Sequence, residues 1–259
     1  MERIFKDQMN RTVRLEGIPC RIVSLVPSQT ELLYDLGLST EVVGITKFCI
    51  YPNEWYRKKQ RVGGTKQLNI DAIRSLNPDF IIGNKEENTK EDILELEKIA
   101  PVWMSDIYTY EDALNMIEQL GEIIGKAEAA EELIIDIQHN FESLKLSFKK
   151  LSFIYFIWKE PDFIVGKNTF IDSLLTKIGL HNTCNENRYP KWNDTTIQAD
   201  CIFLSSEPYP FNEEHITVFQ ERFPNSKIYI INGEMCSWYG SRMKLAPAYF
   251  SDFLKKLQD

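Results

Sequence analysis

The sequence predicts an α/β fold in which two lobes are joined by one long helix. Two observations support this prediction. Apolar residues recur at alternating steps of three and four through residues 127–151, which is the pattern of one continuous helical stripe. On both sides of that segment, short β-branched or aromatic runs alternate with helical patterns, as in sheets covered by helices. We therefore expect an N-terminal lobe over residues 1–125, a connecting helix over 126–151 and a C-terminal lobe over 152–259.

The connecting helix is expected to be about 36 Å long at a rise of about 1.5 Å per residue, roughly the width of a small domain. No Gly or Pro interrupts the stripe, and its acids lie early and its lysines late, as the helix dipole favours. A coiled-coil arm or an ordinary surface helix would show the same periodicity, although about three heptads are short for a coiled coil. The position of the segment near the middle of the chain favours a connecting role.

Composition and charge narrow the classes of protein. The chain has 259 residues, of which 43% are hydrophobic and 26% are charged, as is typical of a globular protein. The net charge of -8 argues against a nucleic-acid partner, and no apolar run approaches the roughly 20 residues of a membrane span. The N-terminal residues lack the apolar region of a signal peptide. We expect a monomer that does not span a membrane. It would be periplasmic or on the cell surface if a leader has been removed, and cytoplasmic if the chain is complete.

The cysteines and histidines do not form a recognisable metal or redox motif. Five cysteines lie apart without CxxC spacing, which favours reduced thiols. Cys20 and Cys201 begin apolar runs and are expected to be buried. Three histidines lie far apart in the sequence, too few for a metal cage built from several imidazoles. We therefore expect neither a protein-bound metal nor a cofactor.

The first lobe is expected to begin with a polar lead-in over residues 1–19 that holds one strand. Residues 22–26 form a β-branched run typical of a buried strand. Ser28 and Glu31 have the spacing of a capping box, which predicts that a helix starts there and ends at Gly37. The unit is the strand–loop–helix of a parallel sheet.

The remaining elements follow from the same signals. Asn69, Thr89 and Thr109 are expected to cap helices that run to about residues 76, 99 and 124. Further strands are predicted at residues 41–46, 80–82, 101–103, 152–158, 163–165, 201–204 and 227–231. Further helices are predicted at residues 169–178, 215–222 and 247–257.

Aromatic residues stand at or beyond the carboxyl ends of several predicted strands, the edge where α/β sheets bind ligands. Large flat side chains with polar tips suit a bulky, partly apolar ligand. The loop at residues 48–56 is open to a second interpretation, a hydrophobic lid over the core. The aromatic residues in question are Phe48, Tyr51, Trp103, Trp158, Trp192, Trp238 and Tyr239.

Arg242 follows two of these aromatics and is expected to make a charge-assisted contact with the ligand rather than to stabilise the fold. Its alternative role is a surface ion pair. The sequence has no GxSxG, HExxH, Walker A or GxGxxG motif, and therefore predicts no catalytic residue.

Several segments together resemble the substrate-binding proteins of ABC importers that take up cobalamin, ferric siderophores and haem, the helical-backbone metal receptors. The resemblance extends from about Arg21 to Leu257 and is greatest to the cobalamin-binding members. It rests on the long central helix and on the segments RIVSLVPSQTELLYDLGL, GITKFCIYP, RVGGTKQLNIDAIRSLNPDFII and FIVGKNTFIDSLLTKIGLHN.

The resemblance implies two Rossmann-like lobes with the ligand in a cleft between them. Thr65 stands where the cobalamin-binding members have a tryptophan. Asp71 fits the first of two acidic residues that dock the permease. The second cannot be placed, because no helix to carry it is expected between Trp192 and Asp200. The expected ligand-binding residues are Phe48, Tyr51, Thr65, Trp158, Trp192, Trp238, Tyr239 and Arg242.

We therefore expect a non-enzymatic protein that binds a metal chelate, a corrinoid such as cobalamin rather than a ferric siderophore or haem. It would be the substrate-binding component of an ABC transporter, with a permease as its partner. Two alternatives stay open: a cytosolic protein that handles corrinoids or other metal chelates, and an enzyme on a nitrogenase-like fold. A receptor for a bare metal ion is disfavoured by the few histidines.

Overall fold

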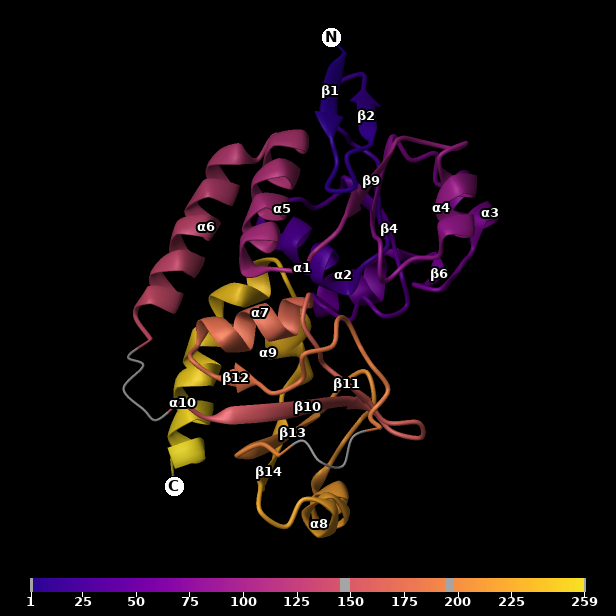
Figure 1. Cartoon of the computed structure of the whole chain (residues 1–259). Helices are drawn as coiled ribbons and strands as arrows, with labels where there is room; N and C mark the ends of the chain where they lie inside the picture. Colours follow the sequence, from indigo (N-terminus) through magenta and orange to yellow (C-terminus); the bar gives the residue numbers. More distant parts are fainter. Residues whose placement is uncertain (1, 145–149, 194–197, 259) are drawn as a thin grey trace. The chain divides into compact units, whose positions relative to one another are not determined.

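The computed structural model describes residues 2–144, 150–193 and 198–258. The chain divides into two compact units, each with its own parallel sheet (Figure 1). The α/β class and the two sheet-containing lobes are confirmed. Unit 1 consists of Met1–Ile107, Glu111–Ile137 and Tyr239–Arg242, and unit 2 consists of Tyr108–Tyr110, Gln138–Trp238 and Met243–Asp259.

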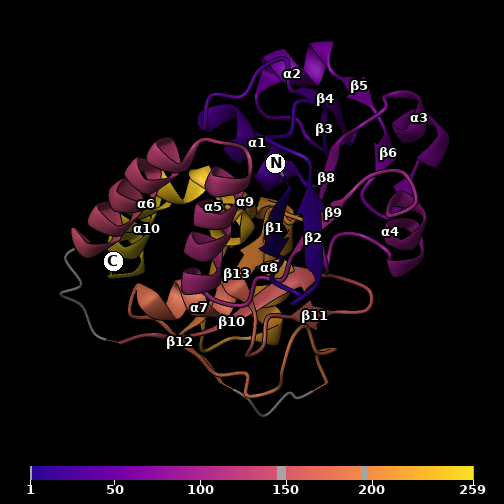
Figure 2. The ribbon, with the colours of Figure 1, turned by 90° about the horizontal axis from the view of Figure 1, so that it is seen from above.

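Unit 1 is built on a five-stranded parallel sheet in the order β5-β4-β3-β8-β9. Because side chains alternate across a strand, each strand contributes to two cores. Val23 and Ile81 join the apolar cluster beneath α3 and α4. On the opposite face, Gln29 Nε2 of α1 donates to Ser105 Oγ of β9 at 2.5 Å. Figure 2 shows α5 on one side of β8 and β9 and α3 and α4 on the other. The strands are β3 (Ile22–Ser24), β4 (Val42–Ile45), β5 (Gln60–Arg61), β8 (Phe80–Asn84) and β9 (Val102–Ser105). The helices are α1 (Pro27–Asp35), α2 (Asn53–Lys58), α3 (Ile70–Ser75), α4 (Lys90–Leu96) and α5 (Tyr110–Ile123).

Two of the predicted helix starts are confirmed by their caps. The Asn69 side chain accepts a hydrogen bond from Ala72 N, and α3 begins at the next residue. The Thr89 side chain accepts from Asp92 N at the start of α4. Both caps satisfy backbone donors that a helix leaves free in its first turn.

The capping box predicted at Ser28 and Glu31 is wrong. The N-cap residue of α1 is Val26, which makes no side-chain cap, and Pro27 occupies the first turn. Proline suits that position because it has no N–H to satisfy and its φ is already helical. The Glu31 carboxylate binds Arg242 instead, 211 residues further along the chain.

The first residues form a hairpin rather than a lead-in with one strand. β1 (Arg3–Lys6) and β2 (Thr12–Leu15) pair antiparallel. The turn between them covers the outer edge of β9, since Gln8 N donates to Met104 O and Asp7 Oδ2 accepts from Met104 N. An edge strand covered in this way cannot pair with another chain.

The predicted connecting helix is shorter than its apolar stripe. α6 (Ala127–Glu142) has 16 residues, and Leu144, Lys150 and Leu151 are not helical. Residues 145–149 of the predicted helix lie outside the described part of the chain. The helix crosses from unit 1 to unit 2 after Ile137.

Two hydrogen bonds meet at one carbonyl at the end of α6. The Ser143 hydroxyl donates to the carbonyl of His139 at 2.8 Å, beside the Ser143 backbone N–H at 3.0 Å. Leu144 N then bonds to Phe141 O, three residues back, which tightens the last turn. Apolar spacing alone does not reveal such an end.

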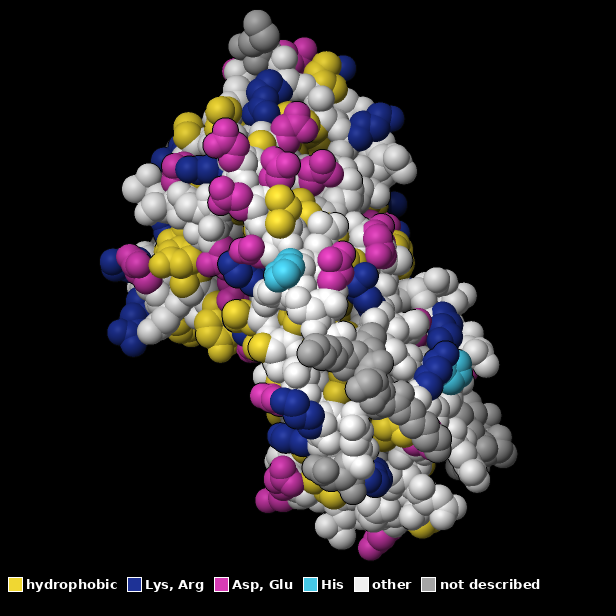
Figure 3. All heavy atoms as spheres, turned by 90° about the vertical axis from the view of Figure 1, so that its left-hand side faces the viewer, with side chains coloured by type: hydrophobic (Ala, Val, Ile, Leu, Met, Phe, Trp, Pro, Cys, Tyr) yellow, Lys and Arg dark blue, Asp and Glu magenta, His cyan; other side chains and the backbone are white. Residues whose placement is uncertain are grey.

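The exposed side of α6 is acidic, and acidic side chains gather on the face shown in Figure 3. The helix contributes Glu128, Glu131, Glu132 and Asp136 to this surface. Within the described residues, no helix is both long enough and apolar enough to cross a bilayer.

Unit 2 contains a sheet in the order β11-β10-β13-β14, with β12 beside β10. β11 is antiparallel to β10 and the other pairs are parallel. Phe153 and Phe203 face α10, whose Phe253 lies 5.3 Å from the Phe203 ring. Ile154 and Phe156 face the opposite way, into the cluster around Phe219 of α8. The strands are β10 (Ser152–Trp158), β11 (Phe163–Ile164), β12 (His181–Asn182), β13 (Cys201–Ser205) and β14 (Lys227–Ile231). The helices are α7 (Phe170–Lys177), α8 (Glu213–Arg222), α9 (Gly233–Ser237) and α10 (Ala246–Gln258), and the 3₁₀ helix η1 (Ser241–Lys244) begins in the unit 1 segment and ends in unit 2.

The two cysteines expected to be buried behave differently. Cys201 is buried in β13, as predicted. Cys20 is exposed, because it precedes β3 and its backbone N–H and thiol meet the Asp79 carboxylate at the surface. The neighbouring carboxylate also raises the pKa of the Cys20 thiol, which keeps it neutral.

Candidate ligand-binding site

The aromatic loop after β4 exposes apolar side chains at the carboxyl edge of the unit 1 sheet. Phe48 is 50% exposed, and Ile50 and Tyr51 are 41% and 37% exposed. Trp55, by contrast, is buried in α2 and meets the Tyr34 ring edge to face. Trp55 therefore belongs to the core, as the lid interpretation expected, while the earlier residues of the loop face solvent.

The loop is anchored by Cys49, which sequence analysis did not assign to a role. Its thiol points inward between the outward side chains of Phe48 and Ile50, and the residue is fully buried. Thr30 Oγ1 donates to Cys49 Sγ at 3.1 Å, and Thr46 Oγ1 lies at the same distance. Burial raises the pKa of the Cys49 thiol, so it stays neutral and acts as a small anchoring group.

Two glycines form a turn that packs against the Phe48 ring. Gly63 and Gly64 form β6 (Gly63–Gly64), which pairs with β7 (Gln67–Leu68). Gly63 has a φ of 100°, a conformation that favours glycine. A Cβ on Gly64 would stand 3.1 Å from the Phe48 ring and 3.2 Å from Lys47 Cε. The pair thus makes a tight turn on which the aromatic loop rests.

Thr65 lies at the tip of that turn and is buried, with 8% of its surface exposed. Its carbonyl accepts a hydrogen bond from Asn88 Nδ2 at 3.0 Å, and Asn88 Oδ1 accepts from Asn84 N at the end of β8. The turn is therefore fixed to the carboxyl edge of the sheet. Phe48 and Thr65, both expected at the site, belong to the same edge of unit 1.

Arg242 does not occupy the exposed position that the sequence suggested. Its side chain is only 8% exposed and forms a two-pronged ion pair with Glu31. Nε donates to Glu31 Oε2 at 2.8 Å and Nη2 donates to Oε1 at 2.6 Å. The flat guanidinium also lies 4.3 Å from the centre of the Tyr51 ring. The ion pair foreseen as the alternative is present, but it is buried rather than at the surface.

Glu31 is the site residue that sequence reasoning missed in unit 1. Its spacing from Ser28 suggested a cap, and no local pattern links α1 to the segment after β14. Tyr239, from the same segment as Arg242, packs against the core of unit 1. The segment Tyr239–Arg242 is thus attached to unit 1, although Trp238 and Met243 on either side belong to unit 2.

Asp71 has the exposure that a docking residue requires. Its side chain is 91% exposed on α3 and lies 2.6 Å from Arg74 Nη1. A surface pair of this kind contributes little to stability, about 0–1 kcal/mol. Its carboxylate can therefore exchange Arg74 for another cation at small cost.

The tryptophans predicted to follow strand ends have different surroundings. Trp158, at the end of β10, is 42% exposed and meets the Tyr209 ring edge to face at 5.8 Å. Trp192 is half-buried against Phe156 and Phe223 and belongs partly to the core. Trp103, in unit 1, is fully buried in β9 and is a core residue.

Trp238 is half-buried and is held by a carboxylate. Its indole Nε1 donates to Glu207 Oε1 at 2.9 Å. Glu207 follows β13 and was not selected from the sequence, since a single acid in a loop carries no local signal.

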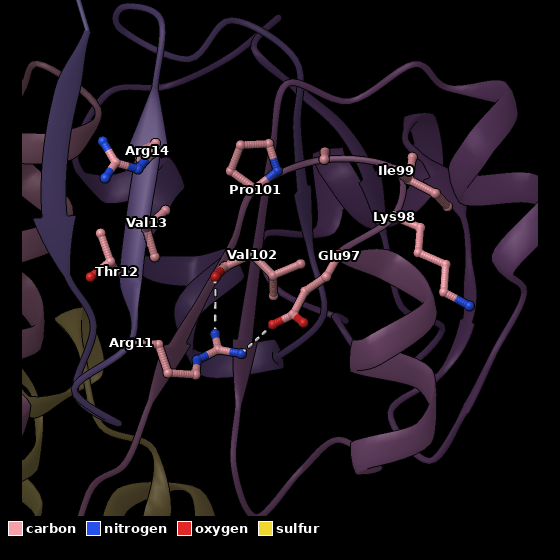
Figure 4. Close-up of a pocket in the computed structure, with 10 residues that line it drawn as sticks. Arg11, Thr12, Val13, Arg14, Glu97, Lys98, Ile99, Pro101 and Val102 are labelled. Atoms are coloured by element: carbon pink, nitrogen blue, oxygen red, sulfur yellow. Dashed lines mark hydrogen bonds and ion pairs between the residues drawn. The ribbon is translucent and has the colours of Figure 1, made fainter.

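A groove elsewhere in unit 1 does not have the character of a ligand site. It has a volume of about 540 Å³ and lies between β2 and the start of β9, at the amino end of that strand. Figure 4 shows Arg11 pointing to Glu97 and to the carbonyl of Val102. The other basic side chains of the groove also form ion pairs, Arg14 with Glu2 and Lys98 with Glu95.

Metal ligands do not converge in the part of the chain that the structure covers. No group of three or more His, Cys, Asp or Glu side chains there could hold a metal ion. Exposed aromatic side chains, among them Phe48 and Trp158, do stand at the carboxyl edges.

The fold and the aromatic edges define a two-lobed α/β binding protein, and comparison with known proteins gives its family. The model of the periplasmic binding protein family matches residues 22–206. The chain belongs to this family.

The curated relatives are similar over part of their length. An uncharacterised ABC transporter substrate-binding lipoprotein of Bacillus subtilis is 30% identical over 68% of this chain and 59% of its own length. A vitamin B12-binding protein of Vibrio campbellii is 25% identical over 66% of this chain and 63% of its own length. The matched regions thus span about three fifths of these relatives.

Solved structures match almost the whole chain. The periplasmic vitamin B12 binding protein BtuF of Vibrio cholerae aligns with a TM-score of 0.78 and 21% identity, covering 94% of this chain and 99% of that one. A periplasmic haem-binding protein, RhuT of Roseiflexus, aligns with a TM-score of 0.80 and 17% identity, covering 92% and 99%. At these identities the likeness establishes the fold.

Proposed function

We propose that this chain is the non-enzymatic substrate-binding component of an ABC importer and that it binds a metal chelate. The expected chelate is a corrinoid such as cobalamin, ahead of haem or a ferric siderophore. The proposal includes a location outside the cytoplasmic membrane, a monomeric state and a permease that docks at Asp71. The ligand cleft between the lobes and the long connecting helix are also part of it and rest on the resemblance.

One observation carries the proposal. Phe48, Ile50 and Tyr51 stand exposed in a row at the carboxyl edge of a parallel sheet, on a loop held from behind by Cys49. Large apolar side chains that stay exposed on an anchored loop are typical of a binding surface. The family and the names of its relatives supply the class of ligand for that surface.

The negative charge of the chain indicates a ligand that is not a polyanion. The chain carries a net charge of -8, and the exposed side of α6 is acidic. Nucleic acids bind to surfaces of the opposite sign. A corrinoid or a compact chelate does not require a positively charged surface, because apolar burial and a few polar contacts are enough to hold it.

The test is retention during gel filtration. The purified protein would be mixed separately with cyanocobalamin, haemin and a ferric siderophore, and the visible absorbance of the protein peak would be recorded. We expect one chelate to elute with the protein in a ratio near one, and cyanocobalamin is the first choice. Free ferric or cobalt ions under the same conditions should not be retained. Elution of all three chelates apart from the protein would refute the proposal.

The glycine turn beneath Phe48 gives a finer prediction. In Gly64→Ala the new methyl group would press on the Phe48 ring, which is free to move because half of it is exposed. We expect the melting temperature to change little and the affinity for the retained chelate to fall several-fold. The matched control is Gly17→Ala, where a Cβ would meet nothing within 4 Å. If both variants bound the chelate with equal affinity, Phe48 would not be a ligand-binding residue.

A further inference from the structure

Glu207 accepts a hydrogen bond from Trp238, one of the aromatic side chains expected at the ligand. It follows β13, at the carboxyl edge of the unit 2 sheet, and its Oε1 accepts two hydrogen bonds from the end of α9. Trp238 Nε1 donates at 2.9 Å and Ser237 Oγ donates at 3.0 Å. Both donors are side chains, and both meet the same carboxylate oxygen.

α9 is brought to Glu207 by a close backbone approach. Gly233, its first residue, leaves no room for a side chain, since a Cβ would stand 2.4 Å from Glu207 Cγ and 2.7 Å from Ser205 Oγ. Gly233 N donates to Ser206 Oγ at 3.0 Å. Asn232 caps the helix by accepting from Met235 N. The short helix therefore has a fixed position on the end of β13.

The backbone of Glu207 is held from the core side. Tyr155 Oη lies 2.9 Å from Ser205 Oγ, and Ser205 Oγ in turn donates to the Glu207 carbonyl. Tyr155 is fully buried, and this burial raises the pKa of its phenol well above the usual value. A neutral hydroxyl pair thus supports the loop from which the carboxylate projects.

We infer that Glu207 is a positioning residue that fixes the orientation of the Trp238 indole. An indole has a single N–H, so one strong acceptor determines how the ring is turned about its side-chain bonds. A charged acceptor makes a shorter and stronger bond than a neutral one. The role in binding rests on the proposed function, whereas the orientation of the ring does not.

The ring orientation is tested without ligand. Tryptophan labelled with ¹⁵N in the indole gives one N–H signal for each of the five tryptophans, and the signal missing in Trp238→Phe identifies Trp238. In the unsubstituted protein we expect this signal to be shifted downfield and to exchange slowly with solvent. Glu207→Leu should move it upfield and accelerate its exchange at least tenfold. Glu207→Gln keeps a carbonyl acceptor and should preserve most of the shift.

The second arm measures binding with cyanocobalamin and haemin as probes. Glu207→Leu should weaken the probe that the unsubstituted protein binds by about tenfold, and Glu207→Gln by much less. In a Trp238→Phe background, Glu207→Leu should have no further effect, because the carboxylate acts through the indole.

The outcomes separate the two claims. An unchanged Trp238 signal in Glu207→Leu overturns the inference. Equal loss of affinity in both backgrounds also overturns it, because Glu207 would then contact the ligand itself. If neither probe binds the unsubstituted protein, the choice of ligand is wrong, and the indole signal alone decides whether Glu207 orients Trp238.

Discussion

Arg242→Ala is expected to lower the free energy of unfolding by about 3–5 kcal/mol, as when one partner of a buried ion pair is removed. The Glu31 carboxylate, whose side chain is 14% exposed, would lose both of the hydrogen bonds that Arg242 gives it. It would remain largely buried without its counter-charge. Urea denaturation, followed by circular dichroism, measures the loss.

Matched variants distinguish the loss of a buried ion-pair partner from the loss of a paired charge at the surface. Arg74→Ala removes an arginine that also pairs with an acid, but at the surface, and should change the free energy of unfolding by less than about 0.5 kcal/mol. The double variant Glu31→Ala with Arg242→Ala should be more stable than the sum of the single losses predicts, since no charge is left unpaired. A change in Arg242→Ala as small as that in Arg74→Ala would mean that the buried pair does not form in solution.

Phe48→Ala should produce the largest loss of binding. Half of the ring is exposed in the free protein, so its removal should change the free energy of unfolding little. Covering a phenyl ring with a flat ligand stabilises a complex by roughly 1.5–3 kcal/mol, which corresponds to a loss of at least tenfold in affinity. The quenching of tryptophan fluorescence by the retained chelate gives the dissociation constants.

Tyr56→Ala is the control for that measurement. Tyr56 is 37% exposed and belongs to α2, beyond the loop that carries Phe48, where Arg61 lies over its ring at 4.5 Å. Removing it takes away a similar aromatic surface from outside the expected site, so affinity should be kept. If Tyr56→Ala weakened binding as much as Phe48→Ala, the ligand would lie on a wider surface of unit 1.

The parts of the fold set by local patterns could be predicted from the sequence. β10 and β14 have the predicted bounds, because each is a short apolar run between turn residues. The caps at Asn69 and Thr89 also follow from neighbouring residues. The end of α6 could not be read from spacing, because the apolar stripe of the sequence continues past Glu142, where the helix stops.

The candidate site was predictable only as a set of residue types. Aromatics after strand ends correctly placed Phe48 and Tyr51 in an exposed loop. Their supports could not be found in the same way. Glu31 binds Arg242 from 211 residues away, and Glu207 binds Trp238 from 31 residues away. Such pairs depend on how distant segments meet in the folded chain.

The central claim is that the chain binds a metal chelate through the aromatic edge that contains Phe48. Isothermal titration calorimetry of the purified protein with cyanocobalamin, haemin and a ferric siderophore tests it most directly. The account predicts saturable binding of one of the three at a single site per chain, with affinity reduced at least tenfold in Phe48→Ala. Absence of saturable binding for all three chelates, or equal affinity in Phe48→Ala, would contradict it.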